Sequence, residues 1–574
     1  MKKQNGHVLG FFIFIISFFW IKFCTSYLIS FKLDHEPVLL YTRDYLLDHF
    51  SSYGGVAELF AQFISQFYVN PWLGALALTL VFMAIVNRSF SLARKNPATG
   101  VLLWVLSLAL FSFSKNGLVH VIALNMVLSA IDDQEIKKKN AKGLWFERFL
   151  TLPILILAAG SWAWIYVLMI VFRDAFGERK FSGTLHFFIG YAAILGLIAQ
   201  RIIWPMTIKY MLFGTLPFDT IWGIAFLIMS VAALLVDRLP RKEYPSLTAF
   251  CAFATFTLLI TITIMNINNT DRRDERWRNH IKNETFGKII KEAERNDPET
   301  RIQSLYVNYA LAKENRLLDD MFAFPQNFGP DGLLPNPHRG KTTRNINEFW
   351  FIGQFYYDIG YIDKAHRIAV DELVFSGVTP TYTKLMVKCL LADGHVNAAT
   401  KYLNLLNKTL FHRKWAKRYL ALIDDPGALN KEFSKIKKFK PEQTRIISYS
   451  PADNLLSVLQ QQALNPLAFN YLCAYSLLEK QPAFLVDNVW VLAELGYKVI
   501  PKHYQEALMI YQLDHPNEEF DLEGLKTDPQ TTKAFFSFGS QISNDKQPVL
   551  SNYKAYKNMY ILYWFFTDFS RGEA

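Results

Sequence analysis

The chain has 574 residues, of which 51% are hydrophobic and only 19% are Asp, Glu, Lys or Arg. A soluble domain averages about 25% charged residues, so the composition argues against a purely soluble protein. The formal net charge of +11 fits a membrane protein with Lys and Arg in its cytoplasmic loops. Because no basic stripe or RNA-binding motif accompanies that charge, we expect no nucleic-acid partner.

The N-terminus begins MKK and is then apolar from Leu9 to about Phe31. No small-residue cleavage site follows, which predicts an uncleaved first membrane span rather than a signal peptide. Crossing about 30 Å of hydrocarbon takes about 20 apolar residues in a helix. Apolar runs of that kind predict a transmembrane helix bundle over residues 1–267 with eight spans, or seven, at about 9–30, 71–87, 99–114, 117–131, 149–172, 185–204, 218–236 and 247–267.

An acidic segment, SFKLDHEPVLLYTRDYLLDHF (30–50), follows the first span and carries Asp34, Glu36, Asp44 and Asp48. These carboxylates are interpreted either as the solvated rim of the bundle or as a catalytic loop. The next stretch, VAELFAQFISQF (56–67), has apolar residues at helical spacing and predicts an amphipathic helix lying in the membrane interface.

Lys and Arg are concentrated in alternate loops, including 137–142 and the DRRDERWR cluster at 271–278. The positive-inside rule then favours a cytoplasmic N-terminus and, with eight spans, a cytoplasmic C-terminal half. One miscounted span would move that half across the membrane. His120, Asn125 and Arg201 are polar residues in or at the ends of spans and are candidates for function by position. Packing is the favoured explanation for His120, which lies near a helix end, and snorkelling is the favoured explanation for Arg201 at the interface.

The soluble half begins with a basic juxtamembrane linker at 268–283, and its clearest feature is an internal repeat. FWFIGQFYYDIGYIDKAHRIAVDEL (349–373) aligns with TKLMVKCLLADGHVNAATKYLNLL (383–406), so that Gly360 matches Gly394 and Ala365 matches Ala399, 34 residues apart. Thirty-four is the tetratricopeptide period. The first unit resembles that pattern in Phe349, Ile352, Gly353, Tyr356, Ala365 and Ala369, whereas the second has Val387 in place of the glycine.

Similar helix-like segments extend the predicted tetratricopeptide-like repeats over about 284–515, with a C-terminal helical cap or tail at 516–574. Irregular helical hairpins are the alternative, and both make the fold class all-α. A solenoid presents a concave surface that binds peptides or proteins. The apolar NMYILYWFFTDF (558–569) predicts a capping helix, a peripheral membrane contact or a partner site.

Several familiar site motifs are excluded. The cysteines, Cys24, Cys251, Cys389 and Cys473, show no CxxC or metal-type spacing, so neither a disulfide framework nor a metal site is expected. RGKTTR (339–344) lacks the earlier glycine of a phosphate-binding loop, because that position is Pro335. We therefore expect no cofactor.

The stretches YGGVAELFAQFISQFYVNPWLGA, VNYALAKENRLLDDMFAF and KYLNLLNKTLFHRKWAKRY resemble a domain-of-unknown-function family of bacterial polytopic inner-membrane proteins with a tetratricopeptide-like C-terminal half. The resemblance implies a multi-pass inner-membrane location. It brings no activity and no catalytic residues to carry over.

Two functions follow. The first is a membrane-anchored interaction or assembly protein whose helical repeats bind partner proteins. The alternative is a polytopic lipid-linked-sugar glycosyltransferase, since the chain is similar to such enzymes in its acidic first outside loop and interfacial helix. In that case Asp34 or Glu36 would activate the acceptor or hold a divalent cation, which prefers oxygen ligands.

Overall fold

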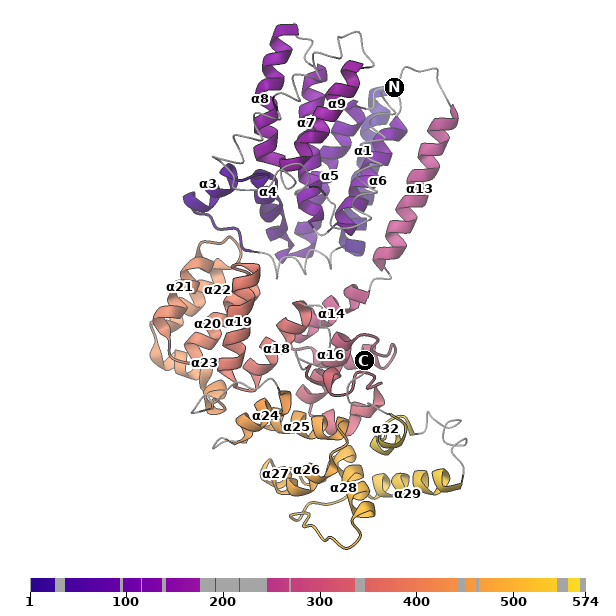
Figure 1. Cartoon of the computed structure of the whole chain (residues 1–574), viewed down its shortest axis with the longest axis vertical. Helices are drawn as coiled ribbons and strands as arrows, with labels where there is room; N and C mark the ends of the chain where they lie inside the picture. The colour runs from indigo at the N-terminus through magenta and orange to yellow at the C-terminus, as the bar shows by residue number, and fades with distance from the viewer. Residues whose placement is uncertain are drawn as a thin grey trace. The chain divides into compact units, whose positions relative to one another are not determined.

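The structure is a computed structural model of the chain (Figure 1). It describes residues 2–25, 37–92, 97–114, 116–136, 141–175, 191, 216, 245–267, 270–335, 346–441, 450–460, 464–544 and 556–567. Within these residues the regular structure is helical and no strand forms, with one isolated bridge between Val499 and Lys526. The expected all-α class is confirmed.

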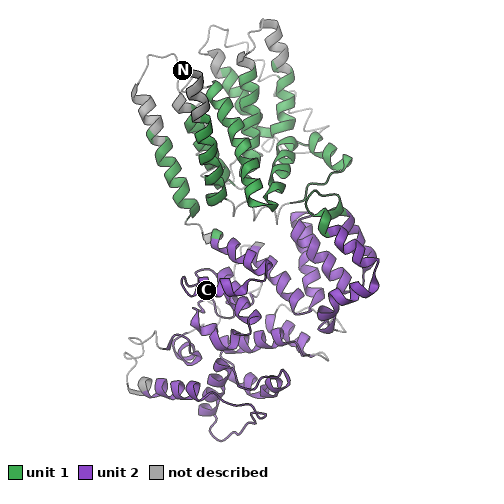
Figure 2. Ribbon diagram, turned by 180° about the vertical axis from the view of Figure 1, so that it is seen from behind, with its two compact units in different colours: residues 1–272, 405–415 green, residues 273–404, 416–574 purple. Residues whose placement is uncertain are grey.

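The chain divides into two compact units (Figure 2). Unit 1 comprises Met1–Arg272 and Leu405–Trp415, and unit 2 comprises Arg273–Asn404 and Ala416–Ala574. The finer division into a linker, a repeat array at 284–515 and a cap at 516–574 stays a prediction.

Unit 1 is a group of apolar helices around a continuous core (Figure 1). Its described helices are α1 (Lys2–Trp20), η1 (Ile21–Thr25), α3 (Arg43–Ser51), α4 (Gly55–Ser65), η2 (Gln66–Val69), α5 (Pro71–Leu92), α6 (Pro97–Phe113), α7 (Gly117–Ile136), α8 (Ala141–Ala159), η3 (Gly160–Trp162), α9 (Ala163–Ala175) and α13 (Pro245–Ile267). Helix α5 lies against α1, α6 and α7, and α13 lies against α6. Because Leu78, Phe82 and Ile85 of α5 are fully buried, this helix forms the centre of the core.

Two stretches among the described residues are long and apolar enough to cross a membrane, Pro71–Leu92 and Leu150–Val171. Shorter apolar helices cover Gly10–Thr25, Gly100–Phe113 and Thr255–Ile267. Apart from residue 191, the expected spans at 185–204 and 218–236 lie outside the described residues, so the predicted number of eight is not confirmed. The second stretch overlaps the expected span at 149–172 but is not one continuous α-helix, because Gly160 adopts φ 58° and a short 3₁₀ turn separates α8 from α9.

Unit 2 consists of shorter helices. They are α14 (Thr270–Lys282), α15 (Phe286–Ala293), α16 (Arg301–Lys313), α17 (Leu317–Asp320), η5 (Met321–Ala323), η6 (Gly329–Gly332), α18 (Ile346–Asp358), α19 (Ile362–Ser376), α20 (Pro380–Ala392), α21 (Val396–Asn407), α22 (Arg413–Ile423), α23 (Pro426–Lys438), α24 (Pro451–Leu459), α25 (Pro466–Leu478), α26 (Pro482–Asp487), α27 (Val489–Glu494), α28 (Lys502–Asp514), α29 (Pro529–Asn544) and α32 (Tyr560–Phe566).

The two matched glycines occupy equivalent turns. Gly360 and Gly394 have φ of 80° and 84°, a left-handed conformation that favours glycine. The N–H of Tyr361 donates to the Tyr356 carbonyl at 2.8 Å, and the N–H of His395 donates to the Leu390 carbonyl at 2.8 Å. This is the Schellman arrangement, which satisfies the last carbonyls of a helix. It joins α18 to α19 and α20 to α21 with identical bonding 34 residues apart.

The same turn recurs elsewhere in unit 2 without that spacing. Glu284, Asn315, Lys480 and Gly496 also have positive φ, and in each turn the following N–H bonds to the carbonyl five residues before it. Five pairs of consecutive helices among the described residues are joined by it: α14–α15, α16–α17, α18–α19, α20–α21 and α25–α26. Unit 2 is therefore built from helical hairpins, while a 34-residue period relates only the Gly360 and Gly394 turns.

Aromatic side chains fill the interior of unit 2. Phe355 is fully buried and its ring lies 4.4 Å from that of Tyr471 and 6.5 Å from that of Tyr309. Tyr356 and Tyr357 are buried as well, so none of the three consecutive aromatics lines an exposed surface. Close helix approach is also visible at Gly353, where a Cβ would lie 3.0 Å from Leu385 Cδ2.

The apolar C-terminal stretch is packed against its own unit. Tyr560 and Ile561 of α32 are buried, and the Ile561 N–H donates to the Glu506 carboxylate on α28 at 3.1 Å. The Tyr563 hydroxyl donates to the Leu478 carbonyl at 3.0 Å. In the described residues this stretch thus behaves as a docked helix of unit 2.

Candidate functional site

The two candidate catalytic residues of the alternative function, Asp34 and Glu36, lie outside the described residues, so the glycosyltransferase alternative stays a prediction. The two other acidic residues of that segment, Asp44 and Asp48, are described: they are exposed, one turn apart on α3. No group of three potential metal-ligating side chains occurs in the described part of the chain. The divalent cation of the alternative is likewise untested.

The amphipathic helix predicted after the acidic segment is present as α4. Its buried side includes Leu59 and Gln62, and Gln62 accepts a hydrogen bond from the Tyr45 hydroxyl of α3 at 2.7 Å. Phe60 and Phe63 are exposed on the other side. A helix with polar anchoring and outward aromatic rings is suited to the membrane interface.

His120 is buried in α7, and its Nδ1 accepts a hydrogen bond from the Trp162 indole N–H at 3.3 Å. The two rings are 5.8 Å apart. This contact between α7 and η3 makes His120 a satisfied packing residue. Arg201, the other ionisable residue named at a span end, lies outside the described residues.

Three further polar contacts join the helices of unit 1. Trp104 of α6 donates to Ser17 of α1 at 3.1 Å, and Trp20 of α1 donates to Thr263 of α13 at 2.9 Å. Arg88 of α5 pairs with the buried Asp132 of α7 at 2.9 Å. Sequence reasoning missed these pairs, because it cannot tell which helices are neighbours; the only available signal was the polar character of each residue within an apolar run.

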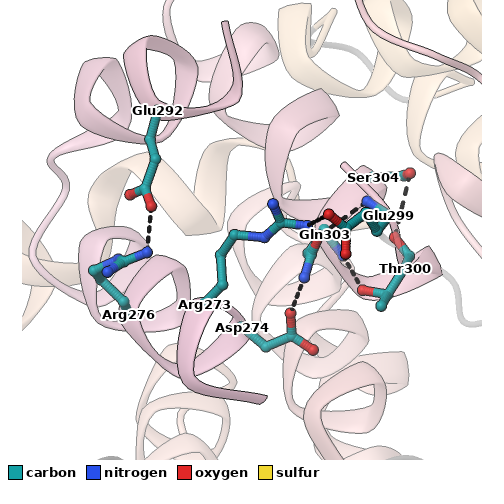
Figure 3. A network of polar contacts seen from close by, with 8 residues as sticks. All are labelled: Arg273, Asp274, Arg276, Glu292, Glu299, Thr300, Gln303 and Ser304. Atoms are coloured by element: carbon teal, nitrogen blue, oxygen red, sulfur yellow. Dashed lines mark hydrogen bonds and ion pairs between the residues drawn. The ribbon is translucent and has the colours of Figure 1, made fainter. Parts of the chain in front are cut away.

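A network of charged side chains fixes the first helices of unit 2 (Figure 3). Gln303 of α16 is buried, donates to Asp274 of α14 at 2.6 Å and accepts from Arg273. Arg276 pairs with Glu292 of α15. The DRRDERWR cluster is thus largely used inside the unit, because Arg278 is also fully buried and pairs with Glu275 at 2.7 Å. These arginines are structural and do not form a free basic surface.

A basic surface does occur on α23, which carries four lysines. Lys431, Lys435 and Lys438 are exposed and lie at helical spacing on one side of the helix; we call them the basic stripe, which differs from the sequence-based expectation that no such stripe is present. The neighbouring helix is held in place by a pair between Arg418 and Glu432 at 3.0 Å. The Asp425 carboxylate caps the start of α23 by accepting from the Gly427 N–H at 3.0 Å and the Ala428 N–H at 3.1 Å.

The cysteines give no reactive site among the described side chains. Cys389 and Cys473 are fully buried in α20 and α25. Burial raises the pKa of both thiols well above the ordinary value, which suppresses the reactive thiolate. The segment RGKTTR (339–344), rejected as a phosphate loop, lies outside the described residues.

The fold and these sites define an all-helical protein with one apolar helical unit and one unit of helical hairpins. The chain belongs to a family of unknown function (DUF6057), whose family model matches residues 2–570. The expected membership in a domain-of-unknown-function family is confirmed. No curated protein and no solved structure matches the chain.

Proposed function

We propose that the chain is an integral membrane protein acting as a membrane-anchored interaction or assembly protein, with unit 1 in the bilayer and unit 2 binding partner proteins. The outer surface of unit 1 carries the proposal. Phe253 of α13 is 70% exposed, Ile154 of α8 is 63% exposed and Phe11 of α1 is 62% exposed. Further exposed apolar residues lie along the same helices and α5. Soluble monomers rarely expose apolar patches of such extent.

The interior of unit 1 supports the same location. The pairs Ser17–Trp104, Trp20–Thr263 and Arg88–Asp132 place polar groups between helices, whereas most of the exposed large side chains on these helices are apolar. Helices in lipid gain little from apolar contact with each other, so packing and interhelical hydrogen bonds hold such bundles together. The two membrane-length stretches support insertion into a bilayer. We further propose that the chain is a bacterial inner-membrane protein of eight spans, or seven, with a cytoplasmic N-terminus.

Alkaline carbonate washing of membranes from cells that express the full chain tests insertion. We expect the protein to stay in the pellet and to be released by detergent; release by carbonate alone would refute the proposal. Reporter fusions at about residue 45 and about residue 300 then test the topology. With eight spans, the two reporters are expected on opposite sides of the membrane. If both reporters lie on the same side, the C-terminal half shares the location of the acidic segment, and this result would favour the enzymatic alternative.

Unit 2 supports the partner-binding role through its construction. Helical hairpins stacked in series expose helix surfaces that bind other proteins, and α23 presents the basic stripe on one of them. Its lysines are exposed, whereas the arginines of α14 are consumed by internal pairs. A surface of like charge favours a partner with an acidic face.

Affinity purification of the full chain after cross-linking in cells tests this role. We expect a partner protein to be captured by the native chain and lost from the charge-reversed variant K431E/K435E/K438E. The matched control K498E/K526E/K533E changes the same charge at exposed lysines elsewhere in unit 2 and should retain the partner. Equal capture by both variants would rule out the basic stripe as the binding surface.

A further inference from the structure

One groove in unit 1 remains unexplained by the contacts described above. It has a volume of about 500 Å³ and is bounded by Ile64 of α4, Phe67 of η2, one side of α5, and Asn125 of α7. The α5 residues in it are Leu73, Leu76, Ala77, Leu80, Val81 and Ala84. Their spacing follows successive helical turns, so they form one continuous stripe.

The groove is open toward the same side as the lipid-facing residues of α5. Leu73, Leu76 and Leu80 line it and are themselves among the exposed apolar residues. Ala77 and Ala84 make the groove deeper, because their side chains are shorter than the leucine and valine side chains beside them. Apart from the Asn125 amide, every side chain named in the lining is a hydrocarbon.

The length of the groove identifies the occupant. From residue 73 to residue 84 the helix rises about 16 Å at about 1.5 Å per residue, close to half of the roughly 30 Å hydrocarbon layer. Its outer end lies by Trp72, which is exposed and has the Lys22 ammonium 4.8 Å from its ring centre. Tryptophan and lysine in such a position mark the water–lipid boundary. The groove therefore runs from the interface through one leaflet.

We propose that this groove binds one acyl chain of a phospholipid from the adjacent leaflet. The proposal rests on the membrane location proposed above. A partner's transmembrane helix would contact α5 over a full span of about 20 residues, whereas the stripe ends at Ala84. Inside a bilayer the hydrophobic effect does not select the occupant, but shape does, because an unfilled groove forfeits van der Waals contacts along its walls.

Substitution of Asn125 can distinguish between two classes of occupant, a plain hydrocarbon chain and a ligand that makes hydrogen bonds. Its Oδ1 is buried without a hydrogen-bond partner among the described residues. An acyl chain offers no donor to that atom, so replacement of Asn125 by leucine should preserve binding. A ligand with a hydroxyl or amide group at this depth would instead depend on the asparagine.

The experiment uses the full chain reconstituted into vesicles of phosphatidylethanolamine and phosphatidylglycerol. The probe is phosphatidylethanolamine with a diazirine near the end of one acyl chain, and labelled peptides are identified by mass spectrometry. We expect α5 from 73 to 84 and the region of Asn125 to be labelled about fivefold more than the exposed residues of α13, since the groove walls contact the chain along its length. Even labelling of both helices would overturn the proposal.

Variants sharpen the result. A77L/A84L fills the groove and should remove the excess labelling, while Thr257→Leu, at an exposed position of α13, should not change it. Asn125→Leu should keep the excess, and its loss in N125L would refute a plain acyl chain. Persistent excess in A77L/A84L would refute the groove as the site. A chain that carbonate extracts and that shows no labelling at all would instead refute the membrane location.

Discussion

The two equivalent glycine turns of unit 2 allow a matched test of the hairpin geometry. Gly360 and Gly394 share the same left-handed backbone and the same hydrogen bonds, but their surroundings differ. A Cβ on Gly360 would lie 2.8 Å from Phe439 Cβ and 3.0 Å from the Phe439 carbonyl carbon. A Cβ on Gly394 would meet nothing within 4 Å. Replacement by alanine therefore adds a backbone clash at one turn only.

The expected costs follow from these distances. Alanine in the left-handed conformation costs roughly 1–2 kcal/mol, so Gly394→Ala should weaken the hairpin by that amount. Gly360→Ala bears the same cost plus about 1–3 kcal/mol for forcing a methyl group into occupied space. Gly394→Asn should be milder than alanine, because asparagine tolerates this conformation and Asn315 adopts it in the equivalent turn after α16.

The buried thiol of Cys389 provides the assay in the intact protein. It lies in α20 between the two turns, and because burial raises its pKa, maleimide should label it only when the hairpins open. When closing is fast, the labelling rate follows the open population, and about 1–2 kcal/mol changes that population about 5- to 30-fold. We expect Gly394→Ala to raise the rate within that range and Gly360→Ala to raise it by at least a further fivefold. Equal rates in the two variants, measured on the Cys389 peptide by mass spectrometry, would refute the described packing of Phe439 on Gly360.

Three other perturbations follow from the structure. Asp425→Ala removes the cap of α23 and should cost about 1 kcal/mol, measured as a lower melting temperature of the detergent-purified protein; no change would contradict the cap. Arg88→Ala should destabilise unit 1 more than Asp132→Ala, because it leaves a buried carboxylate without its cation whereas Arg88 is half-exposed; the reverse order of melting temperatures would refute this. Burial lowers the pKa of His366, so the unfolded state binds the proton more readily and stability should fall as the pH drops below about 6.5; His366→Gln should flatten that dependence, and an unchanged pH profile would show that other groups cause it.

The hairpin construction was only partly predictable from the sequence. Gly360 and Gly394 were visible as matched glycines 34 residues apart, and the structure gives them identical turns. The turns at Glu284, Asn315 and Lys480 use the same backbone geometry without glycine. A non-glycine residue in the left-handed region costs free energy that the packing of the flanking helices must offset. Because that packing involves residues far apart in the sequence, the local sequence does not predict these turns.

The polar residues of unit 1 show a similar limit. His120 and Asn125 stood out because they interrupt apolar runs, yet their roles depend on neighbours that the sequence does not identify. Trp162 satisfies His120, whereas the Asn125 Oδ1 has no partner among the described residues and faces a groove lined by α5. The same type of signal therefore led to a packing residue in one case and to a proposed ligand groove in the other. The two residues differ in which helices lie next to them, and this information comes from the structure.

The arginines at 271–278 bear on two separate questions, the binding of partners and the membrane topology. In the folded protein Arg273, Arg276 and Arg278 are held by internal partners, so they offer little charge to a soluble partner. By the positive-inside rule, membrane topology depends on the Lys and Arg residues close to the ends of spans and not on their partners in the folded unit. Because these arginines are paired internally, they do not form a binding surface. They still count as positive residues beside a span, and they therefore still support the prediction of a cytoplasmic C-terminal half.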